Sequence, residues 1–214
     1  MNKYGKCVVL TIMVLPVCSL HAQSFSATAG VGLEYYDAPS ISRYLAGTTG
    51  GVTPGAFTTS IQLGAGIEYI IFTDWAVGIE YAYLTNQSSG NVYQISYSYS
   101  LPSITLRKIL AGDNYYLRFG GGIGYHSSSL SENIPTLGTT TDYSSSGLGL
   151  KFDAAADTKL GENFYARLDV DARVEFTGNL KAKSGDYLIN HNDQRQVNSN
   201  LSGAGITFGL VYYF

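Results

Sequence analysis

The stretch from Phe164 to Phe176 constrains the fold of this chain more than any other. Apolar residues occupy every second position in it, and five of the six residues between them are charged. A period of two is the repeat of a β-strand, in which successive side chains point to opposite faces of the sheet. This strand therefore has one wholly apolar face and one densely charged face, and the two faces need different environments.

Seven other segments show a similar alternation. The eight segments are 25–36, 58–72, 75–84, 92–109, 115–126, 148–158, 164–176 and 201–214. The connections after the second, fourth and sixth are short, whereas the others are long: 37–57, 85–91, 127–147 and 177–200. Short turns at one end and long loops at the other are typical of outer-membrane barrels. The pattern predicts an all-β fold, an eight-stranded antiparallel up-and-down transmembrane β-barrel in which 201–214 pairs with 25–36 and 164–176.

The fourth segment changes its apolar phase at Pro102. Tyr97 and Tyr99 occupy odd positions before it, while Ile104 and Leu106 occupy even positions after it. Proline cannot donate to a β-ladder, and a bulge inserts one residue and reverses the phase of the side chains. We therefore expect a β-bulge near Pro102.

The composition is that of a β-rich protein with few charges. The chain has 18 Tyr and 25 Gly, and 14% of its residues are charged, against a usual share of about 25%. The net charge of −3 argues against nucleic acid as a partner, because binding to phosphates normally needs a basic face. No ligand spacing points to a metal, and no cofactor is expected.

The first 22 residues have the features of a secretory signal peptide. Lys3 and Lys6 precede an apolar run from Cys7 to Val17, and Ala22 supplies a small residue at a cleavage position. We expect residues 1–22 to be a signal peptide and 23–214 to form one barrel domain. Both cysteines, Cys7 and Cys18, lie within the signal peptide, so the mature chain would contain no disulfide.

The apolar faces indicate that the barrel lies in a membrane. A soluble eight-stranded barrel would turn its apolar face inward around a ligand. Here the apolar face carries Trp75 and many other aromatic and aliphatic residues, with aromatics at the strand ends. In water this face would form an apolar belt far larger than soluble monomers tolerate. In lipid the belt is stable, and closure of the barrel satisfies every backbone N–H and C=O group.

The opposite faces would then fill the lumen with charge. The inward charged residues are Glu34, Glu68, Glu80, Arg118, Lys151, Asp153, Asp157, Arg167, Asp169, Asp171, Arg173 and Glu175. Charges in a low-dielectric interior must be paired or hydrated. We expect salt bridges, chiefly from Arg167 and Arg173 to Asp153, Asp157 and neighbouring acids. These residues could plug the barrel or line a narrow cation-selective pore, and the small interior of eight strands favours the plug.

A possible hydrolytic site lies near the end of the fifth segment. His126 and Ser128, with Glu132 nearby, loosely resemble the His, Ser and Glu of an eight-stranded outer-membrane lipid A deacylase family. In such a site the histidine would activate the serine and the carboxylate would orient the histidine. By phase, however, His126 and Ser128 face the lumen, whereas the site of that family faces lipid.

The last strand carries the clearest family resemblance. Phe208, Leu210, Tyr212 and the terminal Phe214 alternate along one face. A strand that ends the chain in this way resembles the C-terminal strand of bacterial outer-membrane barrels, in which the terminal Phe belongs to the signal read by the insertion machinery. Together with the Gly-rich strands, such as Phe119 to Tyr125, this ending makes 23–214 similar to the OmpA/OmpX-type family of small outer-membrane β-barrels.

The resemblance implies a location and partners but no specific activity. It implies the cell outer membrane, contact with lipid and lipopolysaccharide, and assembly by the insertion machinery. The long loops, rich in Ser, Thr, Gly and Asn, could bind an extracellular ligand. The leading hypothesis is a non-enzymatic barrel with a structural or surface-interaction role. The alternatives are a narrow channel for small solutes or ions and a lipid A-modifying hydrolase.

Overall fold

The computed structural model describes residues 25–48, 58–72, 74–89, 94–134, 139–190 and 192–214. The expected signal peptide lies outside these residues. The elements are β1 (Phe25–Asp37), α1 (Pro39–Thr48), β2 (Thr59–Phe72), β3 (Trp75–Ser89), β4 (Gln94–Ala111), β5 (Tyr115–Ile134), β6 (Thr139–Lys159), β7 (Phe164–Phe176), β8 (Lys181–Ala182), β9 (Ile189–Asn190), β10 (Arg195–Gln196) and β11 (Leu201–Tyr213). Among the described residues, no helix is long and apolar enough to cross a bilayer.

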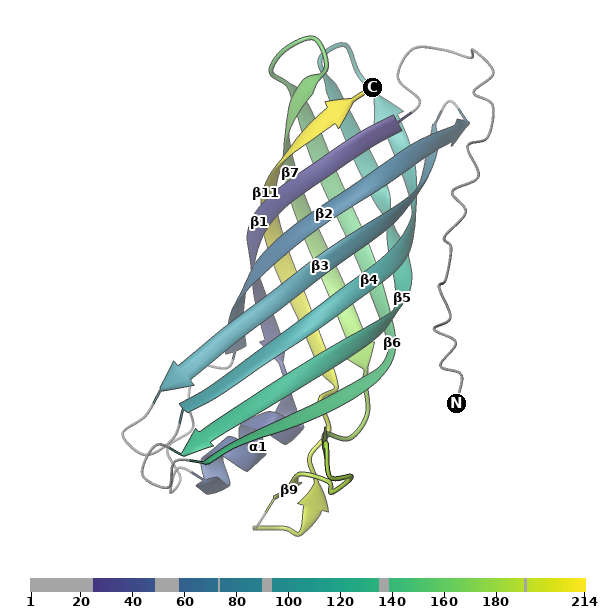
Figure 1. Ribbon diagram of the computed structural model, residues 1–214. Helices are drawn as coiled ribbons and strands as arrows, with labels where there is room; N and C mark the ends of the chain where they lie inside the picture. Colours follow the sequence, from purple (N-terminus) through teal and green to yellow (C-terminus); the bar gives the residue numbers. More distant parts are fainter. Residues whose placement is uncertain (1–24, 49–57, 73, 90–93, 135–138, 191) are drawn as a thin grey trace, which may run out of the picture.

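Eight long antiparallel strands close into a barrel (Figure 1), which confirms the predicted fold. Each long strand pairs with its neighbours in sequence, and β11 closes the ring by pairing with both β1 and β7, as predicted. The short connections after β2, β4 and β6 lie at the end that also holds the C-terminus, which we call the turn side. Helix α1 lies at the opposite end, which we call the α1 side (Figure 1).

Several strands extend far beyond the expected bounds on the α1 side. Strands β5 and β6 have 20 and 21 residues, whereas roughly 9–11 residues span a bilayer. The stretch 127–147 is therefore not the expected loop, because its described residues continue β5 and β6 as paired strands. The other long connections also contain structure: α1 lies within 37–57, and β8, β9 and β10 lie within 177–200.

No bulge forms at Pro102, so that expectation is wrong. The register of β4 with β3 is unbroken through the pair Tyr81↔Pro102. On the other side, the pairing with β5 lacks Leu101 and Pro102 and resumes in the same register at Ser103↔Gly124. This gap is where the missing N–H of proline can be tolerated. Among the described strand pairings, a register shift occurs instead between β2 and β3, at Ile70 and Phe72.

The apolar phase of β4 reverses because the surroundings of the strand change. On the turn side of Pro102, Ile104 points outward and is 63% exposed, while Thr105 and Arg107 are buried inside. On the α1 side, Tyr97, Tyr99 and Leu101 are buried inside, while the serines between them are partly exposed. The first pattern suits lipid outside and polar groups inside, and the second suits water outside and an apolar core. Pro102 therefore lies near one boundary of the membrane.

The outer surface of the turn-side half is an apolar belt. Ile79, Phe152 and Ile67 are 70%, 69% and 61% exposed to the surroundings of the barrel. Tyr35, Tyr125 and Phe176 end the belt on the α1 side, while Phe25, Tyr115 and Phe214 end it on the turn side. An exposed apolar surface of this kind is stable only against lipid or a partner.

The α1-side half of the lumen is filled by a hydrophobic core. The α1-side core consists of Tyr36, Ala38, Ile41, Tyr44, Leu45, Ala82, Leu84, Ile95, Tyr97, Tyr99, Leu101, Leu130, Leu180, Leu188, Val197 and Leu201. Helix α1 contributes Ile41, Tyr44 and Leu45, whose spacing places them on one face of the helix. Leu180, Leu188 and Val197 come from the connection between β7 and β11. Both connections thus close this end of the barrel from within.

Candidate functional site

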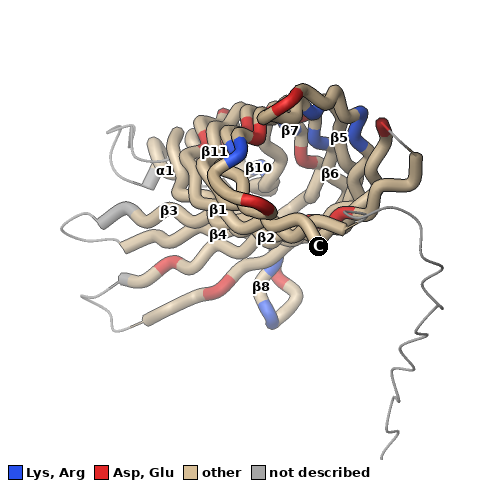
Figure 2. Tube along the Cα trace, turned by 90° about the horizontal axis from the view of Figure 1, so that it is seen from above, with Lys and Arg blue, Asp and Glu red and all other residues tan. Residues whose placement is uncertain are grey.

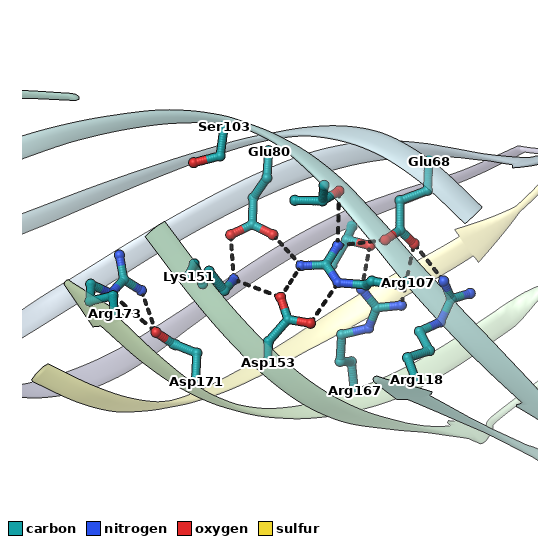
Figure 3. A network of polar contacts seen from close by, with 12 residues as sticks. Glu68, Glu80, Ser103, Arg107, Arg118, Lys151, Asp153, Arg167, Asp171 and Arg173 are labelled. Carbon is teal, nitrogen blue, oxygen red and sulfur yellow. Dashed lines mark hydrogen bonds and ion pairs between the residues drawn. The ribbon is translucent and has the colours of Figure 1, made fainter. Parts of the chain in front are cut away.

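The turn-side half of the lumen contains a dense cluster of paired charges (Figure 3). We call it the lumen charge cluster; it comprises the twelve charged residues expected to face inward together with Arg107. It contains eight carboxylates and five cations. Figure 2, which looks along the barrel, shows charged positions distributed around the strands of the wall. Glycine makes room for these side chains, because a Cβ atom on Gly205 would collide with the Glu34 carboxylate.

Arg107 lies at the centre of the lumen charge cluster. Its guanidinium contacts Glu68 at 2.5 Å, Glu80 at 2.6 Å and Asp153 at 2.5 Å, and these partners come from β2, β3 and β6. Arg107 is 3% exposed. Lys151 adds contacts to Glu80 at 2.5 Å and to Asp153 at 3.4 Å. A planar guanidinium with five donors suits such a position, because it can bind several carboxylates at once.

A second group of contacts surrounds Asp157 at the turn side. Arg118 Nε lies 2.8 Å and Arg167 Nε lies 2.6 Å from the two oxygens of this carboxylate. The hydroxyl of Tyr213 donates to Asp157 at 2.9 Å, and Arg118 also contacts this hydroxyl. Arg118 reaches Glu68 at 2.6 Å and so joins this group to the contacts of Arg107. Residues from β2, β5, β6, β7 and β11 are thereby tied together across the lumen.

A third group surrounds Arg173, nearer the α1 side. Arg173 contacts Asp171 at 2.7 Å and Glu34 at 3.0 Å, and it donates to Gln62 at 3.1 Å. The expected ion pair of Arg167 with Asp157 is present. Asp153, in contrast, pairs with Arg107 and Lys151 and not with Arg167 or Arg173 as expected.

Asp169 borders a small cavity within the lumen. The cavity has a volume of about 50 Å³, measured as the space open to the centre of a water molecule. Thr28, Gln62, Glu80 and Arg107 also line it. A volume of this size holds a few waters, which can hydrate the excess carboxylates of the lumen charge cluster.

Sequence reasoning missed Arg107, although the signal was present. Arg107 has the parity of Thr105 and the opposite parity to Ile104 and Leu106, which face lipid. Once the phase of this half-strand is known, its inward position follows.

His126 lies at the boundary between the two halves of the lumen. Its Nε2 lies 2.9 Å from Ser103 Oγ, and its Nδ1 lies 2.5 Å from Glu175 Oε2. The hydrogen-bonded order serine, histidine, carboxylate is that of a catalytic triad. His126 is 2% and Ser103 is 7% exposed, and Ser103 lines neither the lumen cavity nor the outer groove described below. The geometry therefore joins β4, β5 and β7 but presents no open surface at the serine.

The expected partners of His126 lie elsewhere. Ser128 faces inward, as predicted, but its hydroxyl bonds to Ser145 and Ser199 at 2.8 Å each. Glu132 accepts a hydrogen bond of 2.9 Å from the Tyr44 hydroxyl of α1. The combination of His126, Ser128 and Glu132 as one site is therefore wrong.

Polar groups at the edge of the α1-side core fix the connection between β7 and β11 inside the barrel. The Thr177 hydroxyl bonds to the Ser199 hydroxyl at 2.7 Å, and the Tyr97 and Tyr99 hydroxyls both donate to the Ser199 carbonyl oxygen. Burial raises the pKa of Tyr97 and of Tyr99 well above the usual value of a phenol. Both rings therefore remain neutral hydrogen-bond donors at ordinary pH.

The four residues of the expected insertion signal lie on the outer surface of β11 and at the end of the chain. Phe208, Leu210 and Phe214 are 61%, 51% and 65% exposed, and the ring of Tyr212 lies 4.8 Å from that of Phe214. The Phe214 amide donates to the Phe25 carbonyl at 3.0 Å, which continues the β1–β11 pairing to the last residue. In the part of the chain that the structure describes, no group of His, Cys, Asp and Glu side chains could hold a metal ion.

Comparisons with known proteins give a fold but no close relative. No family model matches the chain, and no curated protein matches it. Among solved structures, a major outer membrane protein of Thermus thermophilus is similar with a TM-score of 0.58 at 14% identity, over 91% of this chain and all of that one. Ail of Yersinia pestis, solved with the heparin analogue sucrose octasulfate, has a TM-score of 0.56 at 12% identity over 91% and 100% of the two chains. OprG of Pseudomonas aeruginosa has a TM-score of 0.53 at 16% identity over 90% and 96%.

These similarities show that the chain has the fold of the small outer-membrane β-barrels. The apolar belt supplies the surface that this fold turns toward lipid. The protein is an integral β-barrel of the outer membrane.

Proposed function

We propose that the protein is a non-conducting, non-enzymatic outer-membrane barrel that holds a folded surface outside the membrane for contact with extracellular molecules. The surface consists of the α1-side ends of β3 to β6, helix α1 and the connection 177–200. The α1 side is the extracellular side in this proposal, because long connections face outward and short turns face the periplasm in such barrels.

The observation that carries the proposal is the filling of both halves of the lumen. The lumen charge cluster crosses the turn-side half from wall to wall, through the contacts of Arg107, Arg118 and Arg167. The α1-side core closes the other half with apolar side chains, among which Leu130 and Leu180 are fully buried. A solute would have to displace both layers, and breaking buried ion pairs is costly.

Conductance across a planar bilayer tests the proposal. We expect no steady current from the parent protein. The informative variant lacks 180–197, because Asn179 and Asn198 already lie opposite each other as a bridged pair and a short turn can join them. This deletion removes Leu180, Leu188 and Val197 from the α1-side core, and we expect it still not to conduct, because the lumen charge cluster remains.

A steady ion-selective current through the parent protein would contradict the proposal and favour the narrow channel. Cation selectivity would be expected of such a channel, because carboxylates outnumber cations in the lumen charge cluster. A current that appears only when the deletion is combined with Arg107→Ala would support the proposal. It would indicate that the lumen charge cluster and the α1-side core each block the lumen independently.

We further propose that Phe208, Leu210, Tyr212 and Phe214 form the signal recognised by the insertion machinery. The support is their common outward face at the end of β11. Removing Phe214 is expected to lower the amount of protein in the outer membrane several-fold, while Phe176→Ala, at the other end of the belt, serves as a control. Equal membrane levels for the Phe214 deletion and the parent would refute this role.

A further inference from the structure

A polar groove lies on the outer wall of the barrel just beyond the apolar belt. It is bounded on one side by β5 and β6, through Ser127, Ser144 and Ser146, and on the other by residues that follow β7. Those residues include Asn179, Lys181 and Tyr187. β8 forms the far wall of the groove by pairing with β6 at Ser144↔Lys181. The volume of the groove is about 640 Å³, which falls within the range of small-ligand sites.

The position of the groove can be fixed relative to the membrane. Tyr125, Leu148 and Phe176 form one row of outward side chains across β5, β6 and β7, and each is more than half exposed. They are the last apolar row on this wall. Ser127 and Ser146 form the next outward row, about 7 Å farther along the strands at the usual rise per residue. The headgroup layer outside the hydrocarbon is roughly 5–8 Å thick on each side, so the groove opens at that level.

The chemistry of the groove suits a phosphorylated sugar. Its walls carry serine hydroxyls, which can both donate and accept as sugar hydroxyls do. Among the described residues, the hydroxyls of Ser127 and Ser144 make no hydrogen bond. The Tyr187 ring is 41% exposed and offers an apolar face to a sugar ring. No carboxylate is among the described residues that line the groove.

Lys181 supplies the positive charge. Its ammonium lies 4.8 Å above the centre of the Tyr187 ring, and no carboxylate of the described residues pairs with it. An ammonium in this state can form charge-assisted hydrogen bonds with a phosphate. Lys183, on the same hairpin, does not line the groove and provides a matched control.

We propose that this groove binds the phosphorylated sugar headgroup of lipopolysaccharide in the outer leaflet, with Lys181 on a phosphate and Tyr187 against a sugar ring. The headgroup is favoured over a soluble glycan because the groove opens directly above the belt, where headgroups are at high local concentration. This proposal rests on the proposed function only in that the α1 side faces the outside of the cell. It does not require a closed lumen, so the conductance test and the binding test can give opposite results.

The test uses the folded protein in phosphatidylcholine nanodiscs doped with lipid A that carries both phosphates. Bound lipid A is counted by native mass spectrometry for the parent and for Lys181→Ala, Tyr187→Ala and Lys183→Ala. We expect about tenfold weaker binding for Lys181→Ala, which corresponds to about 1.4 kcal/mol, and about fivefold weaker binding for Tyr187→Ala. Lys183→Ala should change binding less than twofold. All three sites are exposed, so thermal unfolding should match that of the parent.

Other probes identify the source of the binding. Lipid A with one phosphate should bind more weakly, and phosphatidylglycerol and inorganic phosphate should not compete at equal concentration. Equal binding of phosphatidylglycerol would overturn the proposal in favour of a general attraction of anionic lipids. The proposal would also be overturned if Lys181→Ala and Lys183→Ala weakened lipid A binding equally. It would be overturned as well if a phosphate-free core oligosaccharide competed as strongly as lipid A itself.

Discussion

The two halves of the lumen are filled by opposite kinds of chemistry within one continuous barrel. In the turn-side half, paired charges lie inside and apolar side chains face outward. In the α1-side half, the core is apolar and the outward positions of β5 and β6 are mostly serine and threonine. The backbone does not cause this reversal of polarity, because β4 runs through both halves in a single register with β3. Each half places apolar groups where its surroundings require them.

The largest difference between the halves should appear when a charge is removed from the turn-side half. Arg107→Met would remove the cation that Glu68, Glu80 and Asp153 share in a buried space. Among the described cations, only Arg118 and Lys151 would remain as their close partners. We expect the free energy of unfolding to fall by about 3–5 kcal/mol. Urea unfolding in lipid vesicles, followed by the fluorescence of Trp75, the sole tryptophan, measures this loss.

Lys108→Met is the matched control for this variant. Lys108 is the next residue of β4, and it forms an ion pair with Asp74 in which both side chains are 41% exposed. Exposed pairs contribute about 0–1 kcal/mol, so this variant should be nearly neutral. If the two variants lost equal stability, the central role of Arg107 would have to be abandoned.

A cavity in the α1-side half should have a smaller and more local effect. Leu130→Ala, at a fully buried position, should cost about 3 kcal/mol of local stability. Since the turn-side half keeps its ion pairs, we expect faster amide exchange and proteolysis in α1 and 177–200 but little change in Trp75 fluorescence. Loss of the whole barrel would show instead that the halves unfold as one unit.

The boundary between the halves is tested at His126. His126→Ala removes the contacts with Ser103 and Glu175 and leaves a buried carboxylate without its partner. A loss of about 1–3 kcal/mol is expected, and Ser128→Ala should lose less because its partners Ser145 and Ser199 also bond to each other. Labelling of Ser103 by a fluorophosphonate in the parent, abolished in His126→Ala, would point instead to an active serine hydrolase.

The smallest expected effect is a response of the α1-side half to alkaline pH. The pKa values of Tyr97 and Tyr99 are raised by burial, so the folded state favours the protonated rings. Their contribution to stability is complete below the ordinary phenol pKa of about 10 and declines as the pH rises beyond it. The protection factors of amides in 177–200, which are corrected for the base-catalysed intrinsic exchange rate, should therefore fall above about pH 10. Tyr97→Phe together with Tyr99→Phe should remove this dependence, and its persistence in that variant would assign it to other groups.

Much of the turn-side half could be predicted from the sequence, because lipid imposes one simple pattern. The strict alternation of β7 identifies both its lipid face and its inward charges. Pairings such as Asp153 with Arg107 could not be predicted, since they depend on which residues meet across the lumen. The α1-side half was predicted poorly because its wall has the pattern of a soluble protein. A helical signal was nevertheless present in 37–57, where Ile41, Tyr44 and Leu45 follow the spacing of one helix face.

The uninterrupted β4 has a consequence for how this gene can vary. Because one register serves both halves, the loss of a single codon at Pro102 would rotate one half of the strand relative to the other. Either Tyr97 and Tyr99 would turn toward water, or Arg107 would turn toward hydrocarbon, where a charge is expensive. A single-residue insertion or deletion at this position would therefore be compatible with both halves only if a β-bulge restored the phase. The length of the middle of β4 thus fixes which side chains of this strand face the lumen in each half of the barrel.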